Sequence, residues 1–408
     1  MSEEIPNTGI EKAEETLTDN NAPVQSDEMD CTGGENAAEN IQTDNSSCGE
    51  KTDGGKEDGS EKTSETPAFQ VQSPLFGGNG ANYMLPYVPY GYTPDTYREK
   101  KEIRRISAAV SVPTYFLFIV SIFWGTAAIF IMRAAGIPIE TIRKYLSDPA
   151  ILQVIQIAMS ILLFILPFSI AAKASGYRIS DLAPYGVPQK NAILPHLAMG
   201  VGFCMLANVL VSLGGQVFSD FGIDYSVSYG EDPKGVFGFL LTVISTAIIP
   251  ALAEEFAFRG IVFGMLEKYG EGFAMLVSAL MFGIMHGNFD QMPFAFCVGI
   301  VLACIRINTK SIWLCSLVHC INNLISVIIS STPLDYYFTG MIASFVYMAL
   351  ILWGAVGICK VFNREPPVVL KKPEHCCSVA QKYKWFVFSP AFIIFVVLYI
   401  GESITYFF

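Results

Sequence analysis

Hydrophobic stretches recur along the chain from residue 107 onward, and each is close to the roughly 20 residues that an α-helix needs to cross a bilayer. Backbone groups in lipid must be hydrogen-bonded within the segment, and these stretches lack the alternating polar pattern of a membrane barrel, so they predict helices. The expected fold is all-α, a polytopic membrane helix bundle of eight or nine spans. The candidate spans cover residues 107–132, 149–171, 192–213, 236–258, 272–287, 291–307, 312–330, 340–362 and 385–404.

The segment before the first span has a different composition. Residues 1–65 contain 18 Asp and Glu against 4 Lys, a formal charge of −14; because the 408-residue chain carries −11, the remainder carries +3. This acidic tail has few large apolar side chains and is expected to be disordered, since it cannot bury enough surface to offset the entropy of ordering. Residues 66–105 form a predicted Pro/Gly/Tyr linker with a basic juxtamembrane run, and residues 106–408 form the transmembrane bundle. No cleavable signal peptide is expected.

The composition and the positions of basic residues predict a membrane protein of defined orientation. A chain that is 52% hydrophobic and 15% charged is too apolar for an ordinary soluble protein. Basic residues cluster in "YREKKEIRR" before the first span and in the loop after the eighth, so these segments and the acidic tail are predicted to be cytoplasmic. The acidic loop at 216–234 then falls outside, which fits, whereas Arg133, Arg143 and Lys144 also fall outside, which fits less well. A bacterial plasma membrane is expected rather than the endoplasmic reticulum.

The run "AEEFAFRG" places three charged side chains inside an apolar stretch. A charge at a helix centre in lipid costs roughly 2.5–3.5 kcal/mol, so each of these groups needs a partner. Glu255 and Arg259 are four residues apart on one helix face and are predicted to form a supporting ion pair. Glu254 points about 100° away from Glu255 and has Pro250 and Phe258 one turn before and after it, so its partner must come from another helix or from water. Pro250 also removes a backbone hydrogen bond and predicts a kink.

Two histidines on later apolar runs are the candidate partners. Phe282 and His286 in "LMFGIMHG", and His319 and Asn323 in "SLVHCINN", each lie four residues apart and share a helix face. A single intramembrane His or Asn most often makes an interhelical hydrogen bond. Three polar patches on three helices, together with an unpaired glutamate, predict a functional site instead.

The two remaining histidines lie outside the three polar patches. His196 and His375 have no comparable polar neighbours and are interpreted as structural. With simple alternation of the spans, His286 falls near the outer end of its helix, whereas Glu254 and His319 fall nearer the inner half. Either the span boundaries differ from those predicted or the helices enter the membrane to unequal depths.

The three motifs occur in a fixed order, about thirty residues apart. They resemble the pattern EExxxR, FxxxH and HxxxN of the CAAX-processing and bacteriocin-processing (CPBP) intramembrane endopeptidases, a family that includes the type II CAAX prenyl proteases. Here the pattern appears as "EEFAFR", "FGIMH" and "HCINN". The resemblance covers roughly residues 190–332, and the acidic tail and the last one or two spans lie outside it.

The resemblance implies an intramembrane endopeptidase that hydrolyses a peptide bond of a membrane-associated or prenylated, CaaX-type substrate. Water needs a base within about 2.6–3.2 Å, and Glu254 is the candidate base, with His286 holding or polarising the water. His319 and Asn323 then donate hydrogen bonds to the oxyanion of the tetrahedral intermediate. The other motif residues have supporting roles: the ion pair Glu255 and Arg259, and the aromatic residue Phe282.

A zinc mechanism uses similar residue types, because two histidines and a carboxylate can bind zinc and leave one position for water. The zinc ligands would be Glu254, His286 and His319. Metal-free catalysis without a cofactor is favoured, because the chain has no HExxH motif and the two imidazoles come from separate helices. Zinc stays open as the alternative.

Two other classes of function use the same residues. An intramembrane Glu, Arg and His set can form a proton relay in a membrane transporter, and a non-catalytic immunity or binding membrane protein is a third possibility. Inverted repeats would favour transport, and the two halves of the chain contain none, whereas the ordered FxxxH and HxxxN motifs favour hydrolysis. The expected partners are a peptide or membrane-protein substrate and membrane lipid, with no nucleic acid. No partner is assigned to the acidic tail.

Overall fold

The structure is a computed structural model that describes residues 88–223, 232–332, 336–364, 370 and 376–406. Every regular element in these residues is a helix, so the predicted all-α class is confirmed. Seven of these helices are long and apolar enough to cross a membrane, and a bent pair of helices brings the number to eight. The acidic tail, most of the linker and His375 lie outside the described residues.

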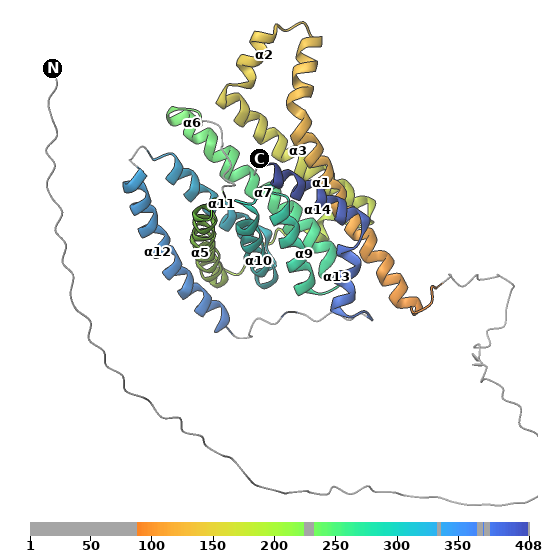
Figure 1. The fold of residues 1–408 in the computed structure, drawn as a ribbon. Helices are drawn as coiled ribbons and strands as arrows, with labels where there is room; N and C mark the ends of the chain where they lie inside the picture. The colour runs from red at the N-terminus through yellow and green to blue at the C-terminus, as the bar shows by residue number, and fades with distance from the viewer. Residues whose placement is uncertain (1–87, 224–231, 333–335, 365–369, 371–375, 407–408) are drawn as a thin grey trace, which may run out of the picture. The chain divides into compact units, whose positions relative to one another are not determined.

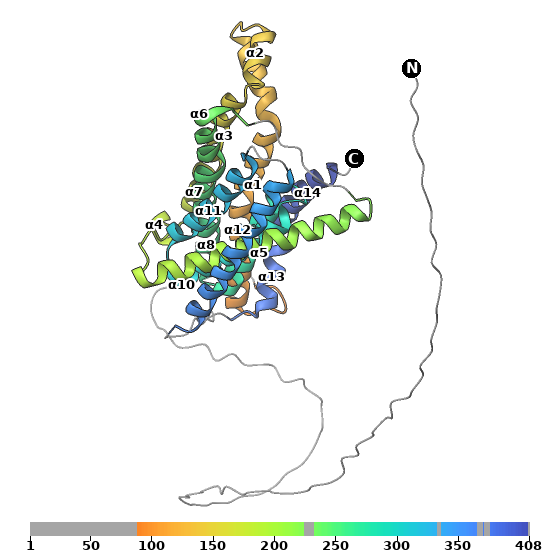
Figure 2. The ribbon, with the colours of Figure 1, turned by 90° about the vertical axis from the view of Figure 1, so that its left-hand side faces the viewer.

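The helices follow one another along the whole described chain (Figure 1). Their bounds are α1 (Pro94–Ala134), α2 (Ile139–Leu146), α3 (Pro149–Ala174), α4 (Ile179–Leu182), α5 (Lys190–Asp220), α6 (Gly235–Thr242), η1 (Val243–Ile248), α7 (Ile249–Glu255), η2 (Phe256–Val262), α8 (Phe263–Glu267), α9 (Glu271–Ile284), α10 (Met292–Thr309), α11 (Ile312–Ser330), α12 (Tyr336–Phe362), α13 (Val379–Val387) and α14 (Pro390–Thr405). The short α2 connects the far ends of the long helices α1 and α3, away from α9 and α10 (Figures 1 and 2).

The helix that carries the two adjacent glutamates runs over 33 residues as α6, η1, α7, η2 and α8. Its two π-helical segments, η1 and η2, lie directly before and after α7. Pro250 lies in the first turn of α7, directly after η1, so a π-helical turn precedes the position at which the sequence predicts a kink. Such turns often occur at functional sites because they change which carbonyl groups are bonded within the helix.

Two predicted spans differ from the structure. The segment predicted at 272–287 is α9, which has only 14 residues. At 1.5 Å per residue it is about 21 Å long, less than the roughly 30 Å of a bilayer core. His286 therefore lies on the turn after a short helix and not at the outer end of a full span, which explains the predicted mismatch in depth. The segment predicted at 385–404 is the pair α13 and α14, bent by 64° at a break before Pro390.

Charged contacts hold together the end of the bundle at which α1 begins. Here Lys268 pairs with Glu102 of α1, and the Nζ atom of Lys310 lies 3.0 Å from Glu267 and 2.9 Å from Glu271. Burial alone would lower the pKa of Lys310, but its hydrogen bonds to Glu271 and Glu267 raise that pKa above its ordinary value. We call this end of the bundle the basic end. The starts of α3 and α6 and the end of α11 lie at the other end.

Glycines allow α5 and α12 to pack at backbone distance. A Cβ atom added at Gly202 would lie 2.5 Å from the Cα atom of Gly354, and one added at Gly354 would lie 2.6 Å from the Cα atom of Gly202. Figure 2 shows α5 and α12 crossing each other. Small residues are common where membrane helices approach this closely. Because α12 follows the region that resembles the protease family, this packing attaches a later helix to that region.

Candidate active site

A cleft of about 550 Å³ brings the predicted site residues together. It lies between α3, α5, η1, α7, α11 and the turn from α9 to α10. Its lining includes five of the predicted residues: Glu254, Phe282, His286, His319 and Asn323. These residues come from three helical segments that are separated in the sequence, so the predicted proximity of the three motifs is observed.

Glu255 connects the helices around the cleft. Its Oε1 atom lies 3.1 Å from Nη1 of Arg259 and 3.1 Å from Nδ1 of His319, and both the Glu255 and Arg259 side chains are wholly buried. The guanidinium of Arg259 also lies over the ring of Phe282, with its carbon 4.3 Å from the ring centre. The predicted ion pair is therefore present. Its link to His319 was not anticipated, because spacing along one helix cannot identify a partner 64 residues away.

Glu254 lies beside the same imidazole, on the side that faces the cleft. Its Oε2 atom is 4.0 Å from Nε2 of His319, and its side chain retains 14% exposure. Since a carboxylate can only accept hydrogen bonds, Glu255 assigns a proton to Nδ1 of His319 and orients Nε2 towards Glu254. His319 is thus the imidazole from another helix that faces Glu254, at a distance longer than a hydrogen bond.

His286 is held by its own turn of chain. Its Nδ1 atom lies 2.8 Å from the carbonyl oxygen of Phe282, and because a carbonyl only accepts, Nδ1 carries the proton and Nε2 is an acceptor. The side-chain amide of Asn288 donates to the carbonyl of His286 at 2.9 Å, while the Oδ1 atom of Asn288 accepts from the backbone N–H of Gln291 at 2.8 Å. The turn therefore fixes His286 at the wall of the cleft.

Asn323 belongs to a chain of amides that crosses the cleft. It donates to the carbonyl of Thr246 at 3.1 Å and accepts from Asn322 at 3.0 Å. Asn208 of α5 lies 3.5 Å from Asn322. The chain of amides thus connects α5, α11 and η1, and leaves the second N–H of the Asn323 amide for another acceptor.

Several polar residues of the cleft were missed by the sequence reasoning. Asn322 follows directly in "HCINN", and the other residues are single polar positions in apolar runs or turns, so only polarity within a predicted span could have drawn attention to them. They are Gln156, Asn208, Asp290, Gln291 and Asn322.

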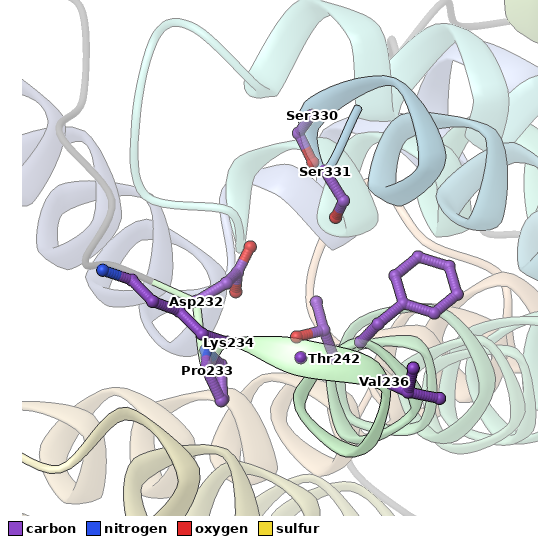
Figure 3. Close-up of a pocket in the computed structure, with 9 residues that line it drawn as sticks. Asp232, Pro233, Lys234, Val236, Thr242, Ser330 and Ser331 are labelled. Atoms are coloured by element: carbon purple, nitrogen blue, oxygen red, sulfur yellow. The ribbon is translucent and has the colours of Figure 1, made fainter. Parts of the chain in front are cut away.

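A second hollow of about 800 Å³ is lined by Asp232, Lys234, Thr242, Ser330 and Ser331, among others (Figure 3). It continues along the same two helices, since Thr242 precedes Thr246 by one turn and Ser330 follows Ser326 by one turn. Asp232 also lines this hollow and accepts a hydrogen bond from Gln153 of α3 at 3.0 Å. The second hollow therefore lies one helical turn beyond the cleft along these two helices.

Two further predictions concern histidine and metal. His196 is buried within α5, where its Nδ1 atom lies 2.8 Å from the carbonyl of Ala192, and it does not line the cleft, as its structural interpretation requires. In the part of the chain that the structure describes, no group of three or more His, Cys, Asp or Glu residues is arranged to hold a metal ion. The side chains as placed therefore do not form the alternative zinc site.

The comparisons with known proteins define the class of this region. Residues 236–325 match the family model "Type II CAAX prenyl endopeptidase Rce1-like". This range contains all three motifs, so the resemblance predicted from them is confirmed for this part of the chain, which is shorter than the predicted 190–332.

Two curated bacterial proteins are similar to parts of the chain. One is the "Putative membrane peptidase YdiL" of Bacillus subtilis (strain 168), 34% identical over 98 residues, which are 24% of this chain and 40% of that protein. The other is the "Membrane-embedded CAAX protease MroQ" of Staphylococcus aureus (strain USA300), 26% identical over 147 residues, which are 33% of this chain and 57% of that protein. The chain thus spans about half the length of these relatives. No solved structure matches.

Proposed function

We propose that the protein is an intramembrane endopeptidase that hydrolyses a peptide bond of a membrane-associated polypeptide, with water activated by Glu254 as the nucleophile. The observation that carries the proposal is the convergence of Glu254, His286, His319 and Asn323 on one cleft inside a helix bundle. The family match at residues 236–325 and the names of the two bacterial relatives support the same class.

Each of the four residues has its own role in the proposed hydrolysis. The carboxylate of Glu254 takes a proton from water while Nε2 of His286 accepts the second O–H, and the hydroxide attacks the carbonyl carbon of the substrate. The oxyanion that forms accepts hydrogen bonds from the free N–H of Asn323 and from Nε2 of His319. For that donation His319 must be an imidazolium, a form that the carboxylate of Glu255 stabilises. Protonated Glu254 then gives its proton to the leaving amine as the C–N bond breaks.

The test is the loss of cleavage in a folded variant. Glu254→Gln keeps the volume and the hydrogen-bonding capacity of the side chain but removes the base, so cleavage of a quenched peptide by the purified protein should fall by at least about 10²-fold. Gln156→Glu, which adds a carboxylate to another wall of the cleft, should not restore it. If Glu254→Gln cleaves the peptide within a few-fold of the unaltered protein, Glu254 is not the base. That result would favour the alternative function, a proton relay in a membrane transporter.

The proposal extends to orientation and partners. We place the basic end in the cytoplasm of a bacterial cell, with membrane lipid around the bundle, so the cleft opens to the outside. A membrane-impermeant maleimide should modify Ser331→Cys in intact cells. The exposed native Cys376, beside α13 at the basic end, should react only after permeabilisation. Reaction of Cys376 in intact cells would show that the basic end faces the outside and that the proposed orientation is wrong.

A further inference from the structure

The charges of the cleft restrict the substrate that the proposed endopeptidase can accept. Among the residues that the structure describes, two that line the cleft carry a formal charge at neutral pH with histidine neutral, and both are acids: Glu254 and Asp290. The remaining polar lining consists of amides, hydroxyls and the two imidazoles. In the described part of the chain, no Lys or Arg lines the cleft.

The nearby cations are already engaged or lie elsewhere. Arg259 is wholly buried and paired with Glu255, so it cannot reach a substrate. Arg306 and Lys310 pair with Glu267 at the basic end. A carboxylate that entered the cleft would therefore lie near two acids with no Lys or Arg to pair with, and the imidazolium of the proposed mechanism, His319, already lies between Glu255 and Glu254, so the entry is unfavourable.

Asp290 is the acid that is free to bind. Its side chain is exposed, and among the described residues it forms no ion pair or hydrogen bond. It lies on the turn that Asn288 fixes, four residues after His286, so its position relative to the proposed water site is defined. Lys234 lines the second hollow and not the cleft (Figure 3). An acidic substrate residue would therefore meet this cation in the second hollow and not beside the proposed water site.

We propose that the cleft binds an internal polypeptide segment with a Lys or Arg near the scissile bond, paired with Asp290. This inference rests on the proposed endopeptidase function and names its substrate class. It disfavours a substrate whose free C-terminal carboxylate lies within a few residues of the cleaved bond, as it does in a C-terminal CaaX sequence. Asp290 is thus a specificity-determining residue.

The experiment compares matched peptides on the full-length protein in detergent micelles. The probes are internally quenched peptides of Ala and Leu, about twelve residues or roughly 40 Å when extended, acetylated and amidated at their ends. A single Lys, Gln or Glu is placed at each position in turn. At the position that lies beside Asp290, kcat/KM for the Lys peptide should exceed that for the Glu peptide about tenfold, because an attractive charge pair replaces a like-charge contact.

Charge variants assign this preference to one residue. Asp290→Asn should reduce the Lys-to-Glu ratio to about twofold or less, and Asp290→Lys should invert it. Asp181→Asn, on α4 and outside the cleft, should keep the ratio of the unaltered protein. A ratio that is unchanged in Asp290→Lys, or a free-acid peptide that is cleaved better than its amide near the terminus, would overturn the proposal.

The two proposals fail in different ways. Cleavage that depends on Glu254 but shows no charge preference would contradict only the substrate class. If no peptide is cleaved, the endopeptidase proposal fails for these probes, and binding still tests the charge preference. Fluorescein-labelled Lys peptides should then bind more tightly than Glu peptides by anisotropy, with the difference lost in Asp290→Asn. Equal binding of both peptides would overturn the inference.

Discussion

The side-chain amide of Asn323 donates to the backbone carbonyl of Thr246 at 3.1 Å. In an α-helix the carbonyl of Thr246 would accept a hydrogen bond from the backbone N–H four residues later, but that residue is Pro250, which has no N–H. The side chain of Asn323 supplies the missing donor. The same amide is proposed to hold the oxyanion. Under that proposal Asn323 has a chemical role beside its structural one, and the two can be separated by mutation.

We predict that Asn323→Ala lowers kcat by about 10²- to 10³-fold through the lost oxyanion contact and lowers stability by about 1–2 kcal/mol through the lost bond to Thr246. In the double variant, Pro250→Ala restores a backbone N–H for Thr246 and should recover part of the melting temperature in detergent. Turnover should stay low. If turnover recovers together with the melting temperature, Asn323 acts only by positioning the helix.

The buried ion pair should behave differently from Glu254. Glu255→Gln and Arg259→Gln each leave an unpaired group among wholly buried side chains, so each should destabilise the protein by about 3–5 kcal/mol and reduce its folded yield. Glu254→Gln, whose side chain is partly exposed, should melt close to the unaltered protein. The double variant of Glu255 and Arg259 should lose less stability than the sum of the losses in the two single variants. Additive losses would show that the two groups are not coupled.

The contact between α5 and α12 gives a test of packing. Gly354→Ala introduces a Cβ atom 2.6 Å from the Cα atom of Gly202, so the helices must separate, and the loss of stability should be about 1–3 kcal/mol. Because α5 carries Asn208 of the cleft, turnover should also fall. Gly340→Ala on the same helix meets nothing within 4 Å and is the control, with a melting temperature unchanged or slightly raised. Equal melting of both variants would contradict the close packing.

Features encoded by local spacing were predictable, and those that depend on distant contacts were not. The helical class and the Glu255–Arg259 pair follow from hydropathy and from the four-residue spacing. The contact of His319 with Glu255 joins residues 64 apart, so no helical periodicity reports it. The length of α9 was misjudged because its apolar run continues past Ile284 into the turn that carries His286. Hydropathy alone does not distinguish a full span from a short helix buried in protein.

Metal dependence is the last question that the site poses. Both imidazoles of the cleft donate Nδ1–H to an oxygen acceptor, Glu255 for His319 and the Phe282 carbonyl for His286, and leave Nε2 free. That arrangement suits a base or hydrogen-bond partner of water, and it is also the arrangement that supports a metal-ligating histidine. The chemistry of these two side chains therefore does not decide between the two mechanisms.

We predict metal-free catalysis by Glu254. Protein dialysed against a chelator should keep its full turnover on a quenched peptide, and elemental analysis of the active protein should find far less than one zinc per chain. His319→Ala should then reduce turnover without changing metal content, because it removes a donor to the oxyanion and the partner of Glu255. In a zinc enzyme about one metal per chain would be present, His286→Ala or His319→Ala would release it, and activity lost on chelation would return with added zinc. Recovery of activity on adding zinc would therefore contradict metal-free catalysis and show that a metal, and not Glu254 alone, activates the water.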